Sequence, residues 1–156
     1  MATTVLGIRS FPDGFSCVVL SGSQSRPSLV HFERYTVPTN NSWPEQLAWV
    51  RRQISEVCEA HKPKRACIKA IESNARKVSR PRLQIEGIVI EFLRSSEHIN
   101  CSSRIKSQLR RDIEDFDAPA RYLGHVIDRH ANFGPLQHLN FEEACLAAIS
   151  ELDLDA

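Results

Sequence analysis

The sequence contains 156 residues, of which 42% are hydrophobic and 25% charged, and its formal net charge is +1. These values are typical of a globular protein and exclude a disordered or fibrous chain. Because no apolar run approaches the roughly 18 residues of a membrane span and the N-terminus does not resemble a signal peptide, we expect one cytoplasmic domain over residues 1–156 with no membrane partner.

The first third of the chain predicts an antiparallel meander of three strands. Val5–Ile8 and Ser16–Leu20 are apolar runs separated by the turn signal Pro12-Asp13-Gly14, and Leu29–Val37 continues as a third strand. Arg9 directly follows the first apolar run. An unpaired charge at the end of a buried strand costs several kcal/mol, so Arg9 needs a partner.

A helix and a fourth strand are predicted next. Ser42 and Glu45 have the spacing of a capping box, and apolar residues at helical spacing continue to Val57. Ala66–Ile71 is a compact apolar run that ends at Glu72. We therefore expect a helix packed on the sheet, followed by a strand with a carboxylate at its end.

The middle of the chain repeats this helix-strand order. Pro81 opens a helix to about Leu93, in which Gly87 indicates close approach to the sheet. His98–Cys101 predicts a short fifth strand. Ser102 or Ser103 then caps a further helix.

The last part of the chain contains one irregular segment and one helix. Residues 116–139 predict an irregular or partly helical connection, because Gly134-Pro135 interrupts any helix. Asn140 has the character of a helix cap, with Glu143 three residues later, and apolar residues follow at helical spacing. Taken in order, the elements predict a mixed α/β fold.

This order resembles the ribonuclease H-like fold, and three stretches resemble its RuvC-type Holliday-junction resolvase branch. The stretches are VLGIRSFPDGFSCVVL, IKAIESNARKVSRPRLQIEGIVIEFL and FEEACLAAISEL. A small uncharacterised bacterial domain family is more similar still, because it shares an S-x-x-I-K segment, here Ser102–Lys106. The resemblance implies a five-stranded mixed sheet, made of the antiparallel meander and two parallel strands and flanked by helices.

In the resembled nucleases, acidic side chains at the strand ends hold two Mg²⁺ ions. Glu72 matches the acid of the second strand, and Glu143, or less closely Glu142, matches that of the final helix. The first acid of the pattern falls on Arg9. A guanidinium cannot ligate Mg²⁺. We therefore expect Arg9 to pair with Glu72 or Glu143, and we expect a degenerate site with no metal, no cofactor and no hydrolytic activity.

Alternative interpretations remain open at this point. An active Mg²⁺-dependent nuclease would use Glu72 and Glu143 with Asp13 as a compensating acid. In another interpretation, the apolar stem of Arg9 stays buried while its guanidinium reaches solvent. Glu143 would then only cap its helix. A third alternative is a protein-interaction module or homodimer, in which a basic face meets an acidic partner.

The loop 74–82 indicates a nucleic-acid partner. Between Lys62 and Arg82 the chain has eight basic residues and a single acid, Glu72. In the resembled fold this loop borders the active face, where basic side chains contact backbone phosphates. The candidate nucleic-acid-binding residues are Arg76, Lys77, Arg80, Arg82, Arg104 and Lys106. A solvated surface is the alternative explanation of the same charges.

Overall fold

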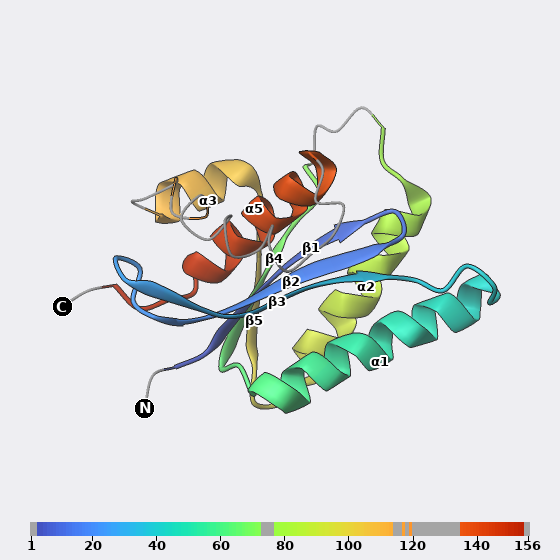
Figure 1. The fold of residues 1–156 in the computed structure, drawn as a ribbon, viewed down its shortest axis with the longest axis horizontal. Helices are drawn as coiled ribbons and strands as arrows, with labels where there is room; N and C mark the ends of the chain where they lie inside the picture. The colour runs from blue at the N-terminus through green and yellow to red at the C-terminus, as the bar shows by residue number, and fades with distance from the viewer. Residues whose placement is uncertain (1–2, 73–76, 114–116, 118, 120–134, 155–156) are drawn as a thin grey trace.

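The computed structural model describes residues 3–72, 77–113, 117, 119 and 135–154 (Figure 1). For residues 135–138 only the course of the backbone is described. The described elements are β1 (Val5–Phe11), β2 (Gly14–Gly22), β3 (Pro27–Thr36), α1 (Trp43–His61), β4 (Arg65–Lys69), α2 (Arg80–Ser95), β5 (Asn100–Arg104), α3 (Lys106–Asp112) and α5 (Pro135–Ile149). No helix in these parts of the chain is long and apolar enough to cross a membrane.

The five strands form one mixed sheet in the order β3-β2-β1-β4-β5. β1 pairs antiparallel with β2, and β2 pairs antiparallel with β3. β4 runs parallel to both β1 and β5. The predicted meander with two added parallel strands is therefore confirmed.

Helices cover both faces of the sheet, with α1 and α2 on one side and α3 and α5 on the other (Figure 1). Successive side chains of a strand point to opposite faces. In β1, Leu6 and Ile8 pack in the core beneath α1 and α2, whereas Val5 packs in the core beneath α5. The same alternation directs Arg9 toward α5 and Ser10 toward α2.

The bounds of all five strands differ somewhat from those predicted, and the differences in β1 and β4 concern candidate site residues. β1 continues through Phe11, so Arg9 lies inside the strand rather than at its end. β4 ends at Lys69, three residues before Glu72. In β1 the buried backbone stays paired beyond the apolar run, because hydrogen bonding to the neighbouring strand is independent of the side chain.

The starts of the last two helices also differ from the predictions. Ser102 and Ser103 do not cap a helix but belong to β5, and Ile105 precedes α3. α5 begins at Pro135, so Asn140 lies inside the helix and the predicted cap there is wrong. Proline favours the first turn of a helix, where its missing N–H has no partner to lose. Most of the predicted connection 116–139 lies outside the described residues.

Gly7 allows α5 to pack directly against β1. A Cβ atom at Gly7 would overlap the backbone of Ala144 and Ala148 in α5. Gly87 was expected to make such an approach, and this prediction is wrong. Gly87 is exposed, and a Cβ atom there would have open space around it.

Replacing each of these two glycines by alanine should change the free energy of unfolding in opposite directions. Gly7→Ala should lower the free energy of unfolding by about 1–3 kcal/mol or more, because the overlap is with backbone that cannot move independently. Gly87→Ala should raise it by about 0.5–1 kcal/mol, because alanine favours the helix. Urea denaturation of both variants measures these changes. Equal stability of the Gly7→Ala variant and the wild type would contradict the packing described here.

Candidate functional site

A cleft of about 370 Å³ lies at the edge of the sheet where β1 and β4 end. The starts of α2 and α5 lie at the same edge (Figure 1). Five cations and two carboxylates are among the residues that line the cleft. These charged residues are Arg9, Lys69, Lys77, Arg82, Lys106, Glu72 and Glu143.

Arg9 is buried and paired with Glu143. Its side chain is 10% exposed, and its Nε donates a hydrogen bond to Glu143 Oε1 at 2.5 Å. A second nitrogen of the guanidinium donates to Oδ1 of Asn140, one turn earlier on α5. The alternative in which Arg9 reaches solvent is therefore wrong. Of its two expected partners, Glu143 is the one that the structure places against it.

Lys69 is a second buried cation at the same place. Ile8 of β1 pairs with Ile68 of β4 in parallel register, so Arg9 and Lys69 follow as neighbours on adjacent strands. The Nζ of Lys69 lies 3.3 Å from Glu143 Oε2. Each oxygen of Glu143 thus contacts its own cation.

The sequence prediction overlooked Lys69, although one signal was present. The apolar run Ala66–Ile68 precedes Lys69, as the run Val5–Ile8 precedes Arg9. In both strands a basic residue therefore follows directly after the apolar run. Only the register between β1 and β4, which is set by long-range pairing, shows that the two cations meet.

Glu72 also contacts this cluster, but from outside the strand. Its Oε2 lies 3.3 Å from Lys69 Nζ and accepts a hydrogen bond from the backbone N–H of Lys106 at 3.3 Å. The side chain of Glu72 is 37% exposed, whereas that of Lys69 is 5% exposed. Glu72 therefore faces the open side of the cleft, and Glu143 lies at its floor.

The ion pairs keep Glu143 ionised despite its burial. Burial raises the pKa of Glu143, but the hydrogen bond from Arg9 and the charge of Lys69 lower it by more. The net pKa lies below the usual range of a glutamate. The deprotonated carboxylate is thus a permanent part of the cluster at neutral pH.

A second polar group lies on the opposite side of β1. Ser10 Oγ accepts a hydrogen bond from Arg82 Nε at 3.3 Å and lies 3.5 Å from Oε1 of the buried Glu86. Burial raises the pKa of Glu86 and outweighs the opposing charge of Arg82. Burial, followed by the nearby charge of Arg9, lowers the pKa of Arg82. Glu86 was not predicted as a site residue, because its position in α2 gives no local signal.

The donor set does not fit the Mg²⁺ ions that the resembled fold implies. Both oxygens of Glu143 are in contact with cations, which would repel a dication at the same place. Asp13, the proposed compensating acid, is exposed on the turn between β1 and β2 and does not line the cleft. Within the described residues, no three His, Cys, Asp or Glu side chains are grouped closely enough to hold a metal ion.

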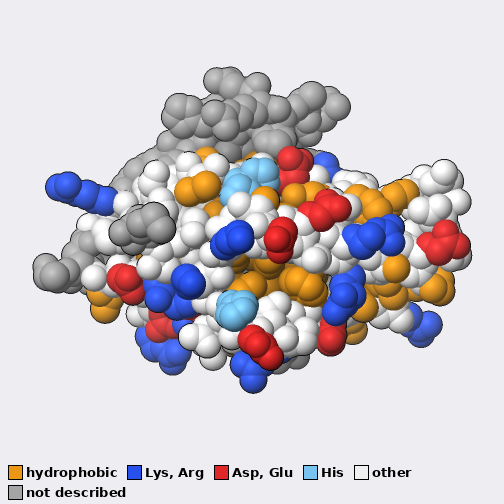
Figure 2. Space-filling model, turned by 90° about the horizontal axis from the view of Figure 1, so that it is seen from below, with side chains coloured by type: hydrophobic (Ala, Val, Ile, Leu, Met, Phe, Trp, Pro, Cys, Tyr) orange, Lys and Arg blue, Asp and Glu red, His pale blue; other side chains and the backbone are white. Residues whose placement is uncertain are grey.

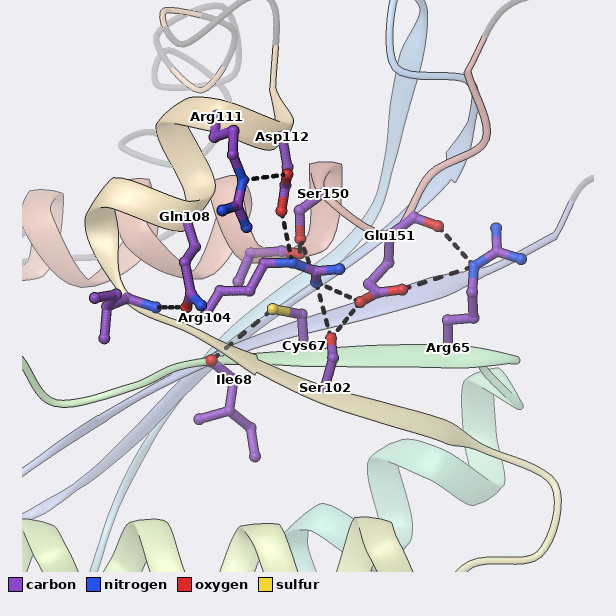
Figure 3. Close-up of polar contacts among 12 residues, drawn as sticks. Arg65, Cys67, Ile68, Ser102, Arg104, Gln108, Arg111, Asp112, Ser150 and Glu151 are labelled. Carbon is purple, nitrogen blue, oxygen red and sulfur yellow. Dashed lines mark hydrogen bonds and ion pairs between the residues drawn. The ribbon is translucent and has the colours of Figure 1, made fainter.

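Arg104 belongs to a different network (Figure 3). Its guanidinium donates to Glu151 at 2.5 Å and to Asp112 at 3.1 Å. It also donates to the hydroxyls of Ser102 and Ser150. These contacts join β5 to α3 and to the C-terminal end of α5. The guanidinium of Arg104 is therefore surrounded by acceptors from the chain itself.

The other predicted phosphate-binding residues differ in their exposure and in whether they line the cleft. Lys77, Arg80 and Lys106 are exposed, and Arg82 is half-buried. Lys77, Arg82 and Lys106 line the cleft itself. Arg76 lies outside the described residues. The rim is therefore formed by the start of α2 together with the start of α3.

The structure is similar to solved Holliday junction resolvases. RuvC of Thermus thermophilus, in complex with a Holliday junction substrate, matches with a TM-score of 0.69 over 95% of this chain and 91% of that chain, at 12% identity. The fowlpox virus Holliday junction resolvase matches with a TM-score of 0.56 over 95% and 97% of the chains, at 8% identity. The yeast mitochondrial resolvase also has a TM-score of 0.56, over 95% and 77%, at 12% identity.

These matches show that the chain has the RuvC-type ribonuclease H-like fold, as the resemblance of its sequence implied. At this level of identity they show the fold alone. No protein-family model and no curated protein matches the sequence. The chemistry that this site supports therefore follows from its own residues.

Glu143→Gln should lower the free energy of unfolding at pH 7 by about 3–5 kcal/mol, because it leaves the buried Arg9 without its anion and Lys69 paired with Glu72 alone. The pKa of Glu143 is depressed in the folded state, so its contribution is present above the unfolded pKa of about 4.3 and is lost as the pH falls through the lower folded value. Urea denaturation at pH 7 and at decreasing pH should show that the free energies of unfolding of the wild type and the variant converge.

Glu59→Gln is the matched control, because Glu59 is exposed on α1. This variant should stay within about 0.5 kcal/mol of the wild type at each pH. If Glu143→Gln were equally harmless, the ion-pair cluster would contribute nothing to stability.

Proposed function

We propose that this chain, which has the RuvC-type ribonuclease H-like fold, has lost metal-dependent hydrolysis and acts as a nucleic-acid-binding protein or as a subunit of a nucleic-acid complex. One observation supports the loss above all others. Arg9 and Lys69 occupy neighbouring strands at the floor of the cleft and contact the two oxygens of Glu143. Two fixed cations there replace the charge that metal ions would supply, but they cannot activate water as a metal does.

The charge distribution supports nucleic acid as the partner. Exposed Lys77 and Lys106 line the cleft together with half-buried Arg82, and exposed Arg80 follows the cleft-lining Ser79 in the chain. By contrast, the face that α1 and α2 cover mixes acidic and basic side chains (Figure 2). Clustered cations neutralise backbone phosphates, whereas interspersed charges give little net attraction.

The solved structure of RuvC in complex with a Holliday junction substrate is consistent with this choice, since that protein shares the fold and binds a DNA junction. Whether this chain prefers branched, duplex or single-stranded nucleic acid is left to the binding experiment.

The purified protein should cleave no branched, duplex or hybrid substrate when Mg²⁺ or Mn²⁺ is titrated, because the carboxylates are paired with cations. Gel analysis of labelled substrates measures cleavage. Cleavage that Glu143→Gln and Glu72→Gln both abolish would overturn the proposal and support the nuclease alternative, with Asp13→Asn as the test of the third acid.

Binding to nucleic acid should weaken steeply as salt increases. Removing two phosphate contacts with Lys77→Ala/Arg80→Ala should lower affinity and reduce the slope of log K against log salt by about 2. Fluorescence anisotropy with labelled branched, duplex and single-stranded oligonucleotides measures both quantities. Arg52→Ala/Lys64→Ala removes the same charge from exposed positions away from the cleft and should leave the slope unchanged.

A flat salt dependence, or equal effects of the two double variants, would contradict nucleic-acid binding at this face. In that case the protein-interaction alternative gains, and a measurement of molecular mass across salt concentrations would show whether the chain associates with itself.

A further inference from the structure

The cleft contains more positive charge than its own carboxylates balance. Two of its five cations, at the floor, already pair with both of its carboxylates. The other three are Lys77, Arg82 and Lys106. Within the described part of the chain, none of these three side chains forms an ion pair. The rim therefore has cations that are available to an anion from outside.

Among the three, the surroundings of Arg82 give the strongest reason to expect a bound anion. Its guanidinium is half-buried and donates one hydrogen bond, through Nε, to Ser10 at 3.3 Å. Burial, and then the positive charge of Arg9, lower its pKa, and Glu86 opposes them only in part. A partly buried cation with incomplete compensation is costly. An anion in the cleft would offset this cost and accept the hydrogen bonds that the fork of the guanidinium offers.

The start of α2 adds to the same preference. Ser79 caps this helix of 16 residues and lines the cleft. The first turn of α2 contains no acidic residue, although an acid commonly occupies that place in a helix. The helix terminus therefore contributes partial positive charge that no side chain of its own neutralises.

We propose that the cleft binds one phosphate group directly, through Arg82, Lys77 and Lys106, without a metal ion. This inference rests on the proposed function and identifies its ligand as a backbone phosphodiester of nucleic acid. A volume of about 370 Å³ lies in the range of small-molecule sites and has room for a phosphate with its adjoining sugar. The paired cations Arg9 and Lys69 form the positive floor beneath it.

Inorganic phosphate alone is the first probe, titrated into the full-length protein at constant ionic strength set by sodium chloride. The ¹⁵N–¹H signal of the Arg82 Nε should shift and saturate, whereas that of Arg52, exposed on α1, should not move. Arg82→Gln should weaken phosphate binding about tenfold or more, because a hydrogen bond to a charged group is lost. Arg52→Gln should bind phosphate as the wild type does.

Lys106→Ala provides a second variant, because Lys106 is exposed and its backbone contact to Glu72 does not involve the side chain. It should also weaken phosphate binding, even if Arg82→Gln failed to fold. Shifts that never saturate, equal shifts at Arg52, or wild-type phosphate affinity in the folded cleft variants would overturn the inference.

Oligonucleotide binding separates the two proposals. If oligonucleotides bind with wild-type affinity to Arg82→Gln and Lys106→Ala, the phosphate site is wrong while nucleic-acid binding stands. If phosphate binds in the cleft but no oligonucleotide binds, the proposed function fails, and the ligand is a free phosphate compound instead. If the same variants bind both inorganic phosphate and oligonucleotides more weakly, the result supports a backbone phosphodiester as the ligand.

Discussion

The contact of Glu143 with Arg9 and Lys69 is the interaction on which the rest of this site depends. It joins α5 to β1 and β4, which are far apart in the sequence, through buried charges. Such a group is stable only when each charge has its partner, because desolvation would otherwise cost several kcal/mol. The absence of a side chain at Gly7 lets α5 come close enough to β1 for Glu143 to reach Arg9. Packing and electrostatics therefore depend on each other here.

The same contact distinguishes this site from the carboxylate cluster that the sequence resemblance implied. Solved structures that share this fold include Holliday junction resolvases. In the nucleases that the sequence resembles, carboxylates hold metal ions at the strand ends, and here two strands bring cations to that edge of the sheet. Because Arg9 and Lys69 belong to the chain itself, they balance the negative charge of Glu143 without a bound cation. The fold is kept, and the charge at its centre is supplied by side chains.

The cations of this edge fall into two groups with different surroundings. Arg9 and Lys69 are buried, and their charges are balanced by carboxylates within the fold. Lys77 and Lys106 are exposed on the rim, where a ligand can reach them. Arg82 is intermediate, because it is half-buried but incompletely compensated. Burial, rather than charge alone, distinguishes a structural cation from a candidate ligand-binding one.

The sequence alone determined the order of elements, the meander with two parallel strands, and the importance of Arg9. These follow from local apolar patterns and from an unpaired charge beside an apolar run. Only the tertiary structure decided that Lys69 lies next to Arg9, since strand register depends on pairing between distant segments. It also decided that Glu143 is an ion-pair partner inside a helix that begins at Pro135. A local capping pattern cannot reveal this, because the position of the carboxylate depends on how α5 packs against the sheet.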